Sequence, residues 1–403
     1  MNQCTLQRRW LGGDPVPSFA RDVRPMFRDK DALLAEGQSL WLDFITRDLV
    51  HGGELERLID EDGIRGETSN PTIFGKAVAM GTAYDRQIDE LAARGYDAEA
   101  IFEALAISDI QDACDLFRPL YEQTDGRDGF VSIEVSPGRA HDTAATVVEA
   151  GRLWQSVARP NVMIKVPGTS EGAPAVEQLL LEGININITL LFSLRNHERV
   201  MQAYIRALAG RITAGLPVDR LASVASFFVS RVDTLVDRLL QERIMAAQGD
   251  AATEERWRGL LGKAAIANAK LAYARFREIF DGNQFHELKK HGARVQRPLW
   301  ASTGTKNPAY RDVLYVEELI GPDTVNTLPQ LTLERFAEHG RVRRTVDQDL
   351  DAARAIMAGL NSAGIDMGAI TQQLEDEGVT LFAAAYADVI ADIEQKRSTH
   401  RRS

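Results

Sequence analysis

The chain has 403 residues, of which 44% are apolar, 26% are charged and 7% are aromatic, with 31 glycines and 14 prolines. These proportions are those of an ordinary globular protein and exclude disorder, collagen-like repeats and low-complexity tracts. The 47 Lys and Arg against 58 Asp and Glu give a formal net charge of −11, which argues against nucleic acid as a partner. The length permits two or three domains, or a single α/β barrel with added helices.

The two cysteines, Cys4 and Cys114, lie far apart and form no CxxC motif. The sequence therefore predicts neither a disulfide framework nor a structural zinc site. No apolar run approaches the roughly 18 residues of a membrane-spanning helix, and the first residues lack the apolar core of a signal peptide. We expect a soluble, cytoplasmic protein without membrane contact that acts on small molecules as a monomer or homodimer.

Residues 1–36 are predicted to be an N-terminal extension, followed by one barrel unit with C-terminal helices over residues 37–398. From Ser39 onward, short apolar runs alternate with longer helical patterns, which is typical of βα units and a parallel sheet. The strand candidates are, in chain order, SLWL, GIRGETS, FVSI, NVMI, GINI, LASVA, RPLWA and DTV. Eight strands predict a closed (β/α)8 barrel, because an open doubly wound sheet more usually has about five or six.

Segments of helical periodicity separate the predicted strands, as the covering helices of a barrel require. Between the strands they include 98–123, 143–158, 194–209 and 254–280. After the last strand, three more helical segments at about 331–340, 347–361 and 366–396 are expected to close the chain over the barrel.

A polar or ionisable residue marks the end of each predicted strand. These residues are Asp43, Asn70, Glu134, Lys165, Thr189, Ser226, Ser302 and Asn326. In a barrel the carboxyl ends of all strands meet around one mouth, and active sites are built there. The sequence therefore predicts that residues far apart in the chain converge on a single site.

Lys165 lies in VMIKVPG, between apolar neighbours. A cation on a buried strand is costly, so burial favours the neutral amine, which attacks carbonyl carbons. This predicts a Schiff-base lysine, although a lysine in a structural ion pair leaves the same pattern. Glu134 and Asp43 are the two carboxylates among the strand-end residues, and Thr189 is placed to hold a water between Glu134 and the lysine. Taken singly, Glu134 is as readily a structural ion-pair partner and Asp43 a helix cap.

Arg231 and the loop STGTK, residues 302–306, predict a phosphate site. Small residues allow backbone N–H groups to approach an anion, and Lys306 adds positive charge. Loops after the late strands commonly bind phosphate in such barrels. For either element alone, the alternative is a solvated basic residue beside an ordinary glycine turn.

Five segments resemble the transaldolase family, and the resemblance spans residues 37–396. They are, in chain order, ETSNPTIF, SIEV, VMIKVPGTSEG, INITLLFS and ASFFVSR. The resemblance implies that Lys165 forms an imine with a ketose, that Glu134 and Thr189 handle the water, and that Asp43 transfers a proton. It also implies substrate contacts, without a metal or other cofactor, from Asn70, Ser226, Arg231 and Ser302.

The resemblance implies transfer of a dihydroxyacetone unit between sugar phosphates in the non-oxidative pentose phosphate pathway. The donors would be sedoheptulose 7-phosphate or fructose 6-phosphate, and the acceptors glyceraldehyde 3-phosphate or erythrose 4-phosphate. A second subgroup of the family resembles simple aldolases that cleave fructose 6-phosphate and carry glutamine and tyrosine where this chain has Glu134 and Phe228. Both residues favour the transferase.

One position departs from the family pattern. Many relatives place an arginine two positions after the serine that matches Ser302, where this chain has Gly304. The next cation is Lys306, so the identity of the second phosphate-binding cation stays open.

A serine hydrolase is the strongest alternative from another class. The segment 168–172 fits GxSxG with Ser170 as nucleophile, and His51 with two following glycines is similar to an oxyanion loop. The context marks no downstream histidine as a partner, and a loop with a helix N-cap explains the same residues. A non-catalytic barrel would not need the charged mouth. The sequence contains no GxGxxG, Walker-type loop or HExxH, so neither nucleotide-dependent chemistry nor zinc hydrolysis is indicated.

Overall fold

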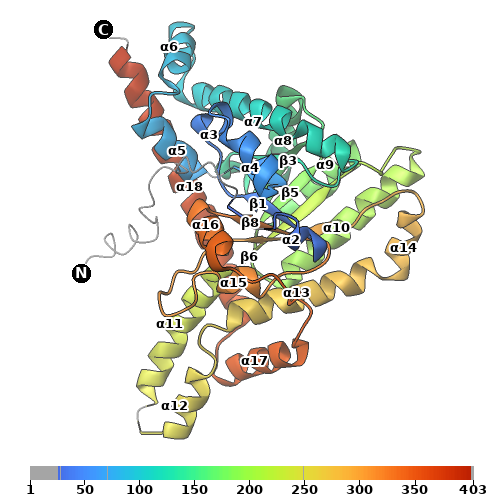
Figure 1. Cartoon of the computed structure of the whole chain (residues 1–403), viewed down its shortest axis with the longest axis vertical. Coiled ribbons are helices and arrows are strands. Elements are labelled where there is room, and N and C mark those ends of the chain that lie inside the picture. The colour runs from blue at the N-terminus through green and yellow to red at the C-terminus, as the bar shows by residue number, and fades with distance from the viewer. Residues whose placement is uncertain (1–25, 28, 70, 248, 401–403) are drawn as a thin grey trace.

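The computed structural model describes residues 26–27, 29–69, 71–247 and 249–400, with the backbone alone for residues 71, 399 and 400. Eight parallel strands in this part of the chain form a closed barrel in the order β1 to β8 (Figure 1). The strands are β1 (Gln38–Leu42), β2 (Gly66–Thr68), β3 (Phe130–Glu134), β4 (Val162–Pro167), β5 (Ile186–Leu191), β6 (Ser223–Phe228), β7 (Arg297–Ala301) and β8 (Thr324–Leu328). The predicted (β/α)8 barrel is confirmed.

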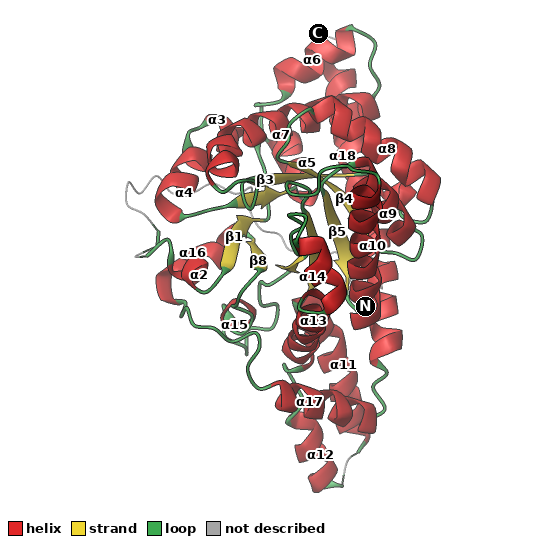
Figure 2. Cartoon of the chain, turned by 90° about the vertical axis from the view of Figure 1, so that its right-hand side faces the viewer, coloured by secondary structure: helices red, strands yellow, loops and turns green. Residues whose placement is uncertain are grey.

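Helices surround this barrel, as Figure 2 shows. They are α2 (Ala32–Ala35), α3 (Arg47–His51), α4 (Glu54–Asp62), α5 (Pro71–Met80), α6 (Asp85–Ala93), α7 (Ala98–Gln123), η1 (Pro137–Arg139), α8 (Thr143–Val157), α9 (Gly172–Glu182), α10 (Leu194–Thr213), α11 (Ser230–Ala246), α12 (Ala251–Arg258), α13 (Ala264–Phe280), α14 (Asn283–Lys289), α15 (Leu314–Glu317), α16 (Gln330–His339), α17 (Leu350–Ser362) and α18 (Met367–His400). None of the helices in the described part combines the length and apolar character of a membrane span.

Two predicted elements differ from the structure because a glycine takes a left-handed backbone conformation. The helix expected over 254–280 is divided into α12 and α13, and Gly262 between them has φ +69°. Its N–H donates to Asp237 Oδ1 at 2.9 Å, which fixes the turn. The strand expected over GIRGETS shortens to three residues, since Gly63 (φ +70°) is the C-cap of α4. Positive φ is readily available to glycine and costly for other residues.

The three C-terminal helices take different places. α18 packs against α5, α7 and α11 and reaches β5, and Asn196 Nδ2 donates to Glu375 Oε2 on α18 at 2.5 Å. α17 packs against α13 instead, so the expectation that all three close over the barrel is wrong for α17. α11, α12 and α17 extend toward one end of the molecule, opposite α6 and the C-terminus (Figure 1, Figure 2).

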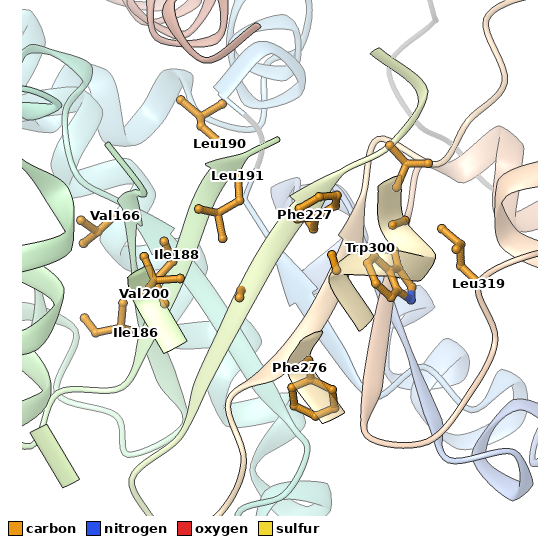
Figure 3. Packing of buried hydrophobic residues seen from close by; sticks show 14 of the residues in the cluster. Val166, Ile186, Ile188, Leu190, Leu191, Val200, Phe227, Phe276, Trp300 and Leu319 are labelled. Atoms are coloured by element: carbon orange, nitrogen blue, oxygen red, sulfur yellow. The ribbon is translucent and has the colours of Figure 1, made fainter. Parts of the chain in front are cut away.

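The barrel interior is filled in layers, because strand side chains alternate between the two faces of the sheet. An inner apolar cluster includes Trp41, Phe130, Met163, Val224, Leu299 and Val325. The outward-facing residues pack beneath the helices, and Figure 3 shows Ile186 and Ile188 of β5 in one cluster with Val200 of α10. Apolar packing thus closes the lower interior and leaves the charged groups to the carboxyl ends of the strands.

The described part of the predicted N-terminal extension packs on the barrel unit. The N–H groups of Met26 and Phe27 donate to Asp62 Oδ1 at 2.5 and 3.1 Å. The ring of Phe27 lies 6.2 Å from that of Phe336 on α16. Most of the predicted extension lies outside the described residues.

Candidate active site

Lys165 and Glu134 form an ion pair at the mouth of the barrel. Their strands β4 and β3 pair in a register that sets Glu134 opposite Lys165, and Lys165 Nζ lies 3.1 Å from Glu134 Oε2. The two side chains are only 12% and 8% exposed. Nζ also donates to the carbonyl of Ser69 at 3.4 Å. Since this pair fits both a structural and a catalytic role, the neighbouring groups decide between them.

Asp43, directly after β1, supplies a second carboxylate in the same electrostatic environment. Burial raises the pKa of Asp43 from 3.8 to about 6, against the opposing charge of Lys165 and a hydrogen bond from Thr68. That bond runs from Thr68 Oγ1 to Asp43 Oδ1 over 2.9 Å. Asp43 is not the cap of the next helix, because Thr46 caps α3 by accepting from Leu49 N–H at 3.3 Å.

Burial also raises the pKa of Glu134, and the ammonium of Lys165 opposes the shift. The charge of Lys165 thus acts on two carboxyl groups whose pKa values are raised above the usual range. Raised carboxyl pKa values bring proton exchange closer to neutral pH, which general acid–base catalysis requires.

Thr189 lies on β5, opposite Pro167 of β4 in the strand register. It is 1% exposed and shares the inward orientation of Asn187, two residues earlier. The register shifts between Ile188 and Leu191, and the backbone of the intervening residue 190 has φ +59°. This irregularity lies where β5 reaches the mouth, and bulges of this kind re-aim side chains beside active sites.

Arg231 lies in the first turn of α11, beside the aromatic pair Phe228 and Phe192. Its guanidinium carbon is 5.6 Å from the ring centroid of Phe228, and the two rings are 5.1 Å apart. Burial lowers the pKa of Arg231, with Asp43 opposing the shift. Within the described ranges, Arg231 makes no hydrogen bond or ion pair. A half-buried cation without an anionic partner, at a helix N-terminus, suits a phosphate group.

The loop after β7 reaches the same helix end. Ser302 has φ +56°, its carbonyl accepts from Ser230 N–H at 3.0 Å, and the two hydroxyl oxygens lie 3.1 Å apart. Farther along the loop, Lys306 is exposed, and its charge lowers the pKa of Asp43. The cations expected at the phosphate site therefore both act electrostatically on the carboxylate at the mouth.

At Gly304, where the chain departs from the family pattern, the loop after β7 packs closely against α16. A Cβ at this position would lie 2.9 Å from Thr332 Oγ1. Thr332 lies on α16, so its side chain is the neighbour that a side chain at position 304 would meet first.

The structure describes one of the two other predicted substrate contacts, Asn70 and Ser226. Asn70 lies outside the described residues. Ser226 is buried one layer below the mouth, where its hydroxyl donates to Asn187 Oδ1 at 2.7 Å. The hydroxyl of Ser226 therefore already has an acceptor within the barrel.

Asn326 does not lie at the end of its strand. It is within β8, and alternation with the inward Val325 turns it out of the barrel. Its Oδ1 accepts from Thr303 Oγ1 at 3.0 Å. The expectation that Asn326 reaches the mouth is wrong.

Comparison with known proteins agrees with this geometry. The family model "Transaldolase/Fructose-6-phosphate aldolase" matches residues 40–393. The chain belongs to this family. Transaldolases of Mycolicibacterium smegmatis and Mycobacterium bovis are each 46% identical, over 360 and 363 residues, covering 89% and 90% of this chain and 95% of each relative. Transaldolase 2 of Nostoc sp. is 44% identical over 362 residues, which are 89% of this chain and 95% of that protein.

The hydrolase motif has a structural explanation in this barrel. Thr169 Oγ1 accepts from Gly172 N–H at 2.9 Å at the start of α9, although the N-cap position itself is Glu171, whose side chain makes no capping hydrogen bond. The hydroxyl of Ser170 donates to Glu171 Oε2 at 2.8 Å. No histidine in the described ranges forms a hydrogen bond with Ser170, and His51 pairs with an aspartate of α7.

Sequence analysis missed two hydroxyl groups at the mouth. Thr68 Oγ1 lies 2.9 Å from Thr327 Oγ1 as well as bonding Asp43. Both threonines occupy inward positions near the carboxyl ends of β2 and β8. Strand alternation was the available signal, but it needs the exact strand ends, which the apolar pattern does not provide.

Proposed function

We propose that this enzyme acts as a transaldolase: it moves a dihydroxyacetone unit from a ketose phosphate to an aldose phosphate through an imine on Lys165. The donors are sedoheptulose 7-phosphate or fructose 6-phosphate, and the acceptors glyceraldehyde 3-phosphate or erythrose 4-phosphate. The observation that carries the proposal is the ion pair of Lys165 with Glu134, 3.1 Å away, in the same electrostatic environment as the half-buried carboxyl of Asp43.

The first half-reaction begins when the ammonium of Lys165 passes a proton to Glu134, 3.1 Å away, and the resulting amine attacks the ketose carbonyl carbon. A further proton moves from the nitrogen to the former carbonyl oxygen, which gives the carbinolamine. Glu134 supplies the proton with which the carbinolamine hydroxyl leaves as water, and Thr189 holds that water. Asp43 then takes the C4 hydroxyl proton, the C3–C4 bond breaks, and its electron pair moves into the protonated imine to form the enamine. The aldose phosphate leaves. Covalent catalysis thus divides a difficult carbon–carbon cleavage into two easier steps.

The second half-reaction reverses these steps on another aldehyde. The enamine carbon attacks the acceptor carbonyl, Asp43 returns its proton to the new hydroxyl, and water held by Thr189 and Glu134 hydrolyses the imine. The low exposure of Lys165 and Glu134 supports retention of the intermediate between the two half-reactions, because bulk water has little access to the imine.

Substrate recognition is divided between the phosphate and the sugar hydroxyls. Arg231, Ser302 and Lys306 bind the phosphate at the N-terminus of α11. The aromatic ring of Phe228 forms the apolar wall beside Arg231. Asn70 and Ser226 bind substrate hydroxyls. The mechanism employs no metal or other cofactor. We further propose that the enzyme is located in the cytoplasm and that it is a monomer or a homodimer.

Trapping the imine tests the mechanism directly. The protein is incubated with fructose 6-phosphate, reduced with borohydride and mapped by peptide mass spectrometry, and we expect a three-carbon adduct on Lys165. Lys165→Met should abolish both the adduct and turnover. Lys270→Met is the matched control, because Lys270 is a second buried lysine paired with a glutamate, Glu318, at 3.1 Å. Unchanged labelling in Lys165→Met would refute the assignment.

The same incubation distinguishes transfer from simple aldol cleavage. A transaldolase retains the three-carbon unit until an acceptor arrives. Without an acceptor, the amount of free dihydroxyacetone released from fructose 6-phosphate should therefore not exceed the molar amount of enzyme. Catalytic release of dihydroxyacetone without an acceptor would instead assign the fructose-6-phosphate aldolase activity.

A further inference from the structure

Two buried aspartates on α11 hold the segment that follows β7, which consists of the loop 302–313 and the short helix α15. Asp233 and Asp237 lie four residues apart, hence on one face of the helix, and are 1% and 6% exposed. Tyr315 Oη donates to Asp233 Oδ2 at 2.9 Å. Tyr310 Oη donates to Asp237 Oδ2 at 2.7 Å. Neither aspartate has a part in the proposed reaction.

The other carboxylate oxygens hold the turn between α12 and α13. Asp233 Oδ1 accepts from Ala265 N–H at 2.7 Å, and Asp237 Oδ1 accepts from Gly262 N–H at 2.9 Å. The ring of Tyr310 lies against Gly262, where an added Cβ would approach its Cζ to 2.6 Å. The same face of α11 therefore binds both the segment after β7 and the α12–α13 turn, which contact each other where Tyr310 meets Gly262.

The loop needs such support because its first residue is strained. Ser302 is not glycine and has φ +56°, a conformation that persists in a non-glycine residue when the surroundings over-determine it. Inside the loop, Thr305 Oγ1 donates to the carbonyls of Arg311 and Asp312 at 3.0 and 3.1 Å, which gives the segment a fixed shape. The tyrosine–aspartate bond at residue 310 attaches this shaped segment to α11.

Arg231 lies on the same helix, two residues before Asp233 and six before Asp237. A phosphate held jointly by Arg231, Ser302 and Lys306 requires a fixed separation between α11 and the loop. The Tyr310–Asp237 hydrogen bond joins these two elements directly, and the Tyr315–Asp233 hydrogen bond joins α11 to α15, which follows the loop. Burial raises the pKa of both tyrosines and of Asp237, in keeping with hydroxyl groups that stay protonated and act as donors.

We propose that Asp237 and Tyr310 are positioning residues for the phosphate site, because they tie the 302–313 loop to the helix that carries Arg231. The inference rests on the proposed function, since it assumes that Ser302 and Arg231 bind the substrate phosphate. Loss of the Tyr310–Asp237 hydrogen bond leaves the reacting groups at Lys165 in place. It weakens only the binding of the substrate phosphate group.

Tyr310→Phe tests the role of the Tyr310–Asp237 hydrogen bond, because it removes the hydroxyl group that donates it. The Michaelis constant for glyceraldehyde 3-phosphate and the inhibition constant of inorganic phosphate should both rise about 3- to 10-fold, the effect of losing one hydrogen bond. kcat should change less than about twofold, and the Michaelis constant for unphosphorylated glyceraldehyde should stay the same. Asp237→Asn retains an acceptor for Gly262 N–H and should give an intermediate effect.

Tyr273→Phe is the matched control. It removes a hydroxyl group that donates to the carbonyl of Pro322 at 3.0 Å, away from the loop, and should leave both constants unchanged. An unchanged phosphate inhibition constant in folded Tyr310→Phe, or an equal loss on both acceptors, would overturn the inference. If the wild-type protein turns over neither acceptor, the proposed function itself fails. That result is distinct from one in which the wild-type protein is active and the loss of the Tyr310–Asp237 hydrogen bond has no effect on phosphate binding.

Discussion

Asp43→Asn distinguishes the catalytic role of the Asp43 carboxylate from its effect on the stability of the folded protein. Burial raises the pKa of Asp43 from 3.8 to about 6 in the folded protein, so the folded state binds this proton more tightly than the unfolded state does. The folded state therefore loses stability as the pH rises through the interval from about 4 to 6. Above that interval the loss is complete.

The size of the effect follows from the shift. A difference of about two pKa units corresponds to roughly 3 kcal/mol at pH 7. Asparagine carries no charge at any pH, so Asp43→Asn should raise the free energy of unfolding by about 1–3 kcal/mol at pH 7. The gain should shrink toward zero as the pH falls to 4. Turnover should fall about 10²- to 10⁴-fold, because the proton acceptor for the C4 hydroxyl is lost.

Urea unfolding at pH 4, 5.5 and 7 measures the stability, and turnover of fructose 6-phosphate with erythrose 4-phosphate measures the activity. Asp351→Asn, at a fully exposed side chain on α17, is the control and should show no pH-dependent gain. A gain in Asp43→Asn that is absent at pH 7, or equal at pH 4 and pH 7, would refute the electrostatic reasoning.

Three further predictions concern the site and the core. Arg231→Ala should raise the Michaelis constant for phosphorylated acceptors about 10- to 100-fold with a smaller effect on kcat; an equal loss with unphosphorylated glyceraldehyde would contradict the phosphate role. Thr68→Val removes a hydrogen bond that lowers the pKa of Asp43. The acidic limb of the plot of kcat/KM against pH should therefore move to higher pH by about 0.5 to 1 pH unit, and an unchanged limb would count against Asp43 as the base. Both carboxyl oxygens of Glu67 are buried without a hydrogen-bond partner and burial raises its pKa, so Glu67→Met should raise the free energy of unfolding at pH 7 by about 1–3 kcal/mol. Urea unfolding checks this last prediction, which a loss of stability would exclude.

Local patterns along the chain were sufficient to predict the barrel and the charged residues at its mouth. Alternating apolar runs and helical stripes reflect which residues are buried, and a parallel barrel brings the carboxyl ends of its strands together. The convergence of Lys165, Glu134 and Asp43 on one mouth follows from those two rules. These features depend on local periodicity, which a single sequence displays.

The direction in which individual side chains face, and the contacts that hold the loops, became evident only in the folded chain. Asn326 was expected at the mouth, but it lies within β8 and turns outward, because it alternates with the inward-facing Val325. The helix expected over 254–280 breaks where Gly262 meets Asp237. The tie between Tyr310 and Asp237 spans 73 residues of sequence. Exact strand ends and long-range hydrogen bonds arise from contacts between distant segments, and local periodicity carries no record of them.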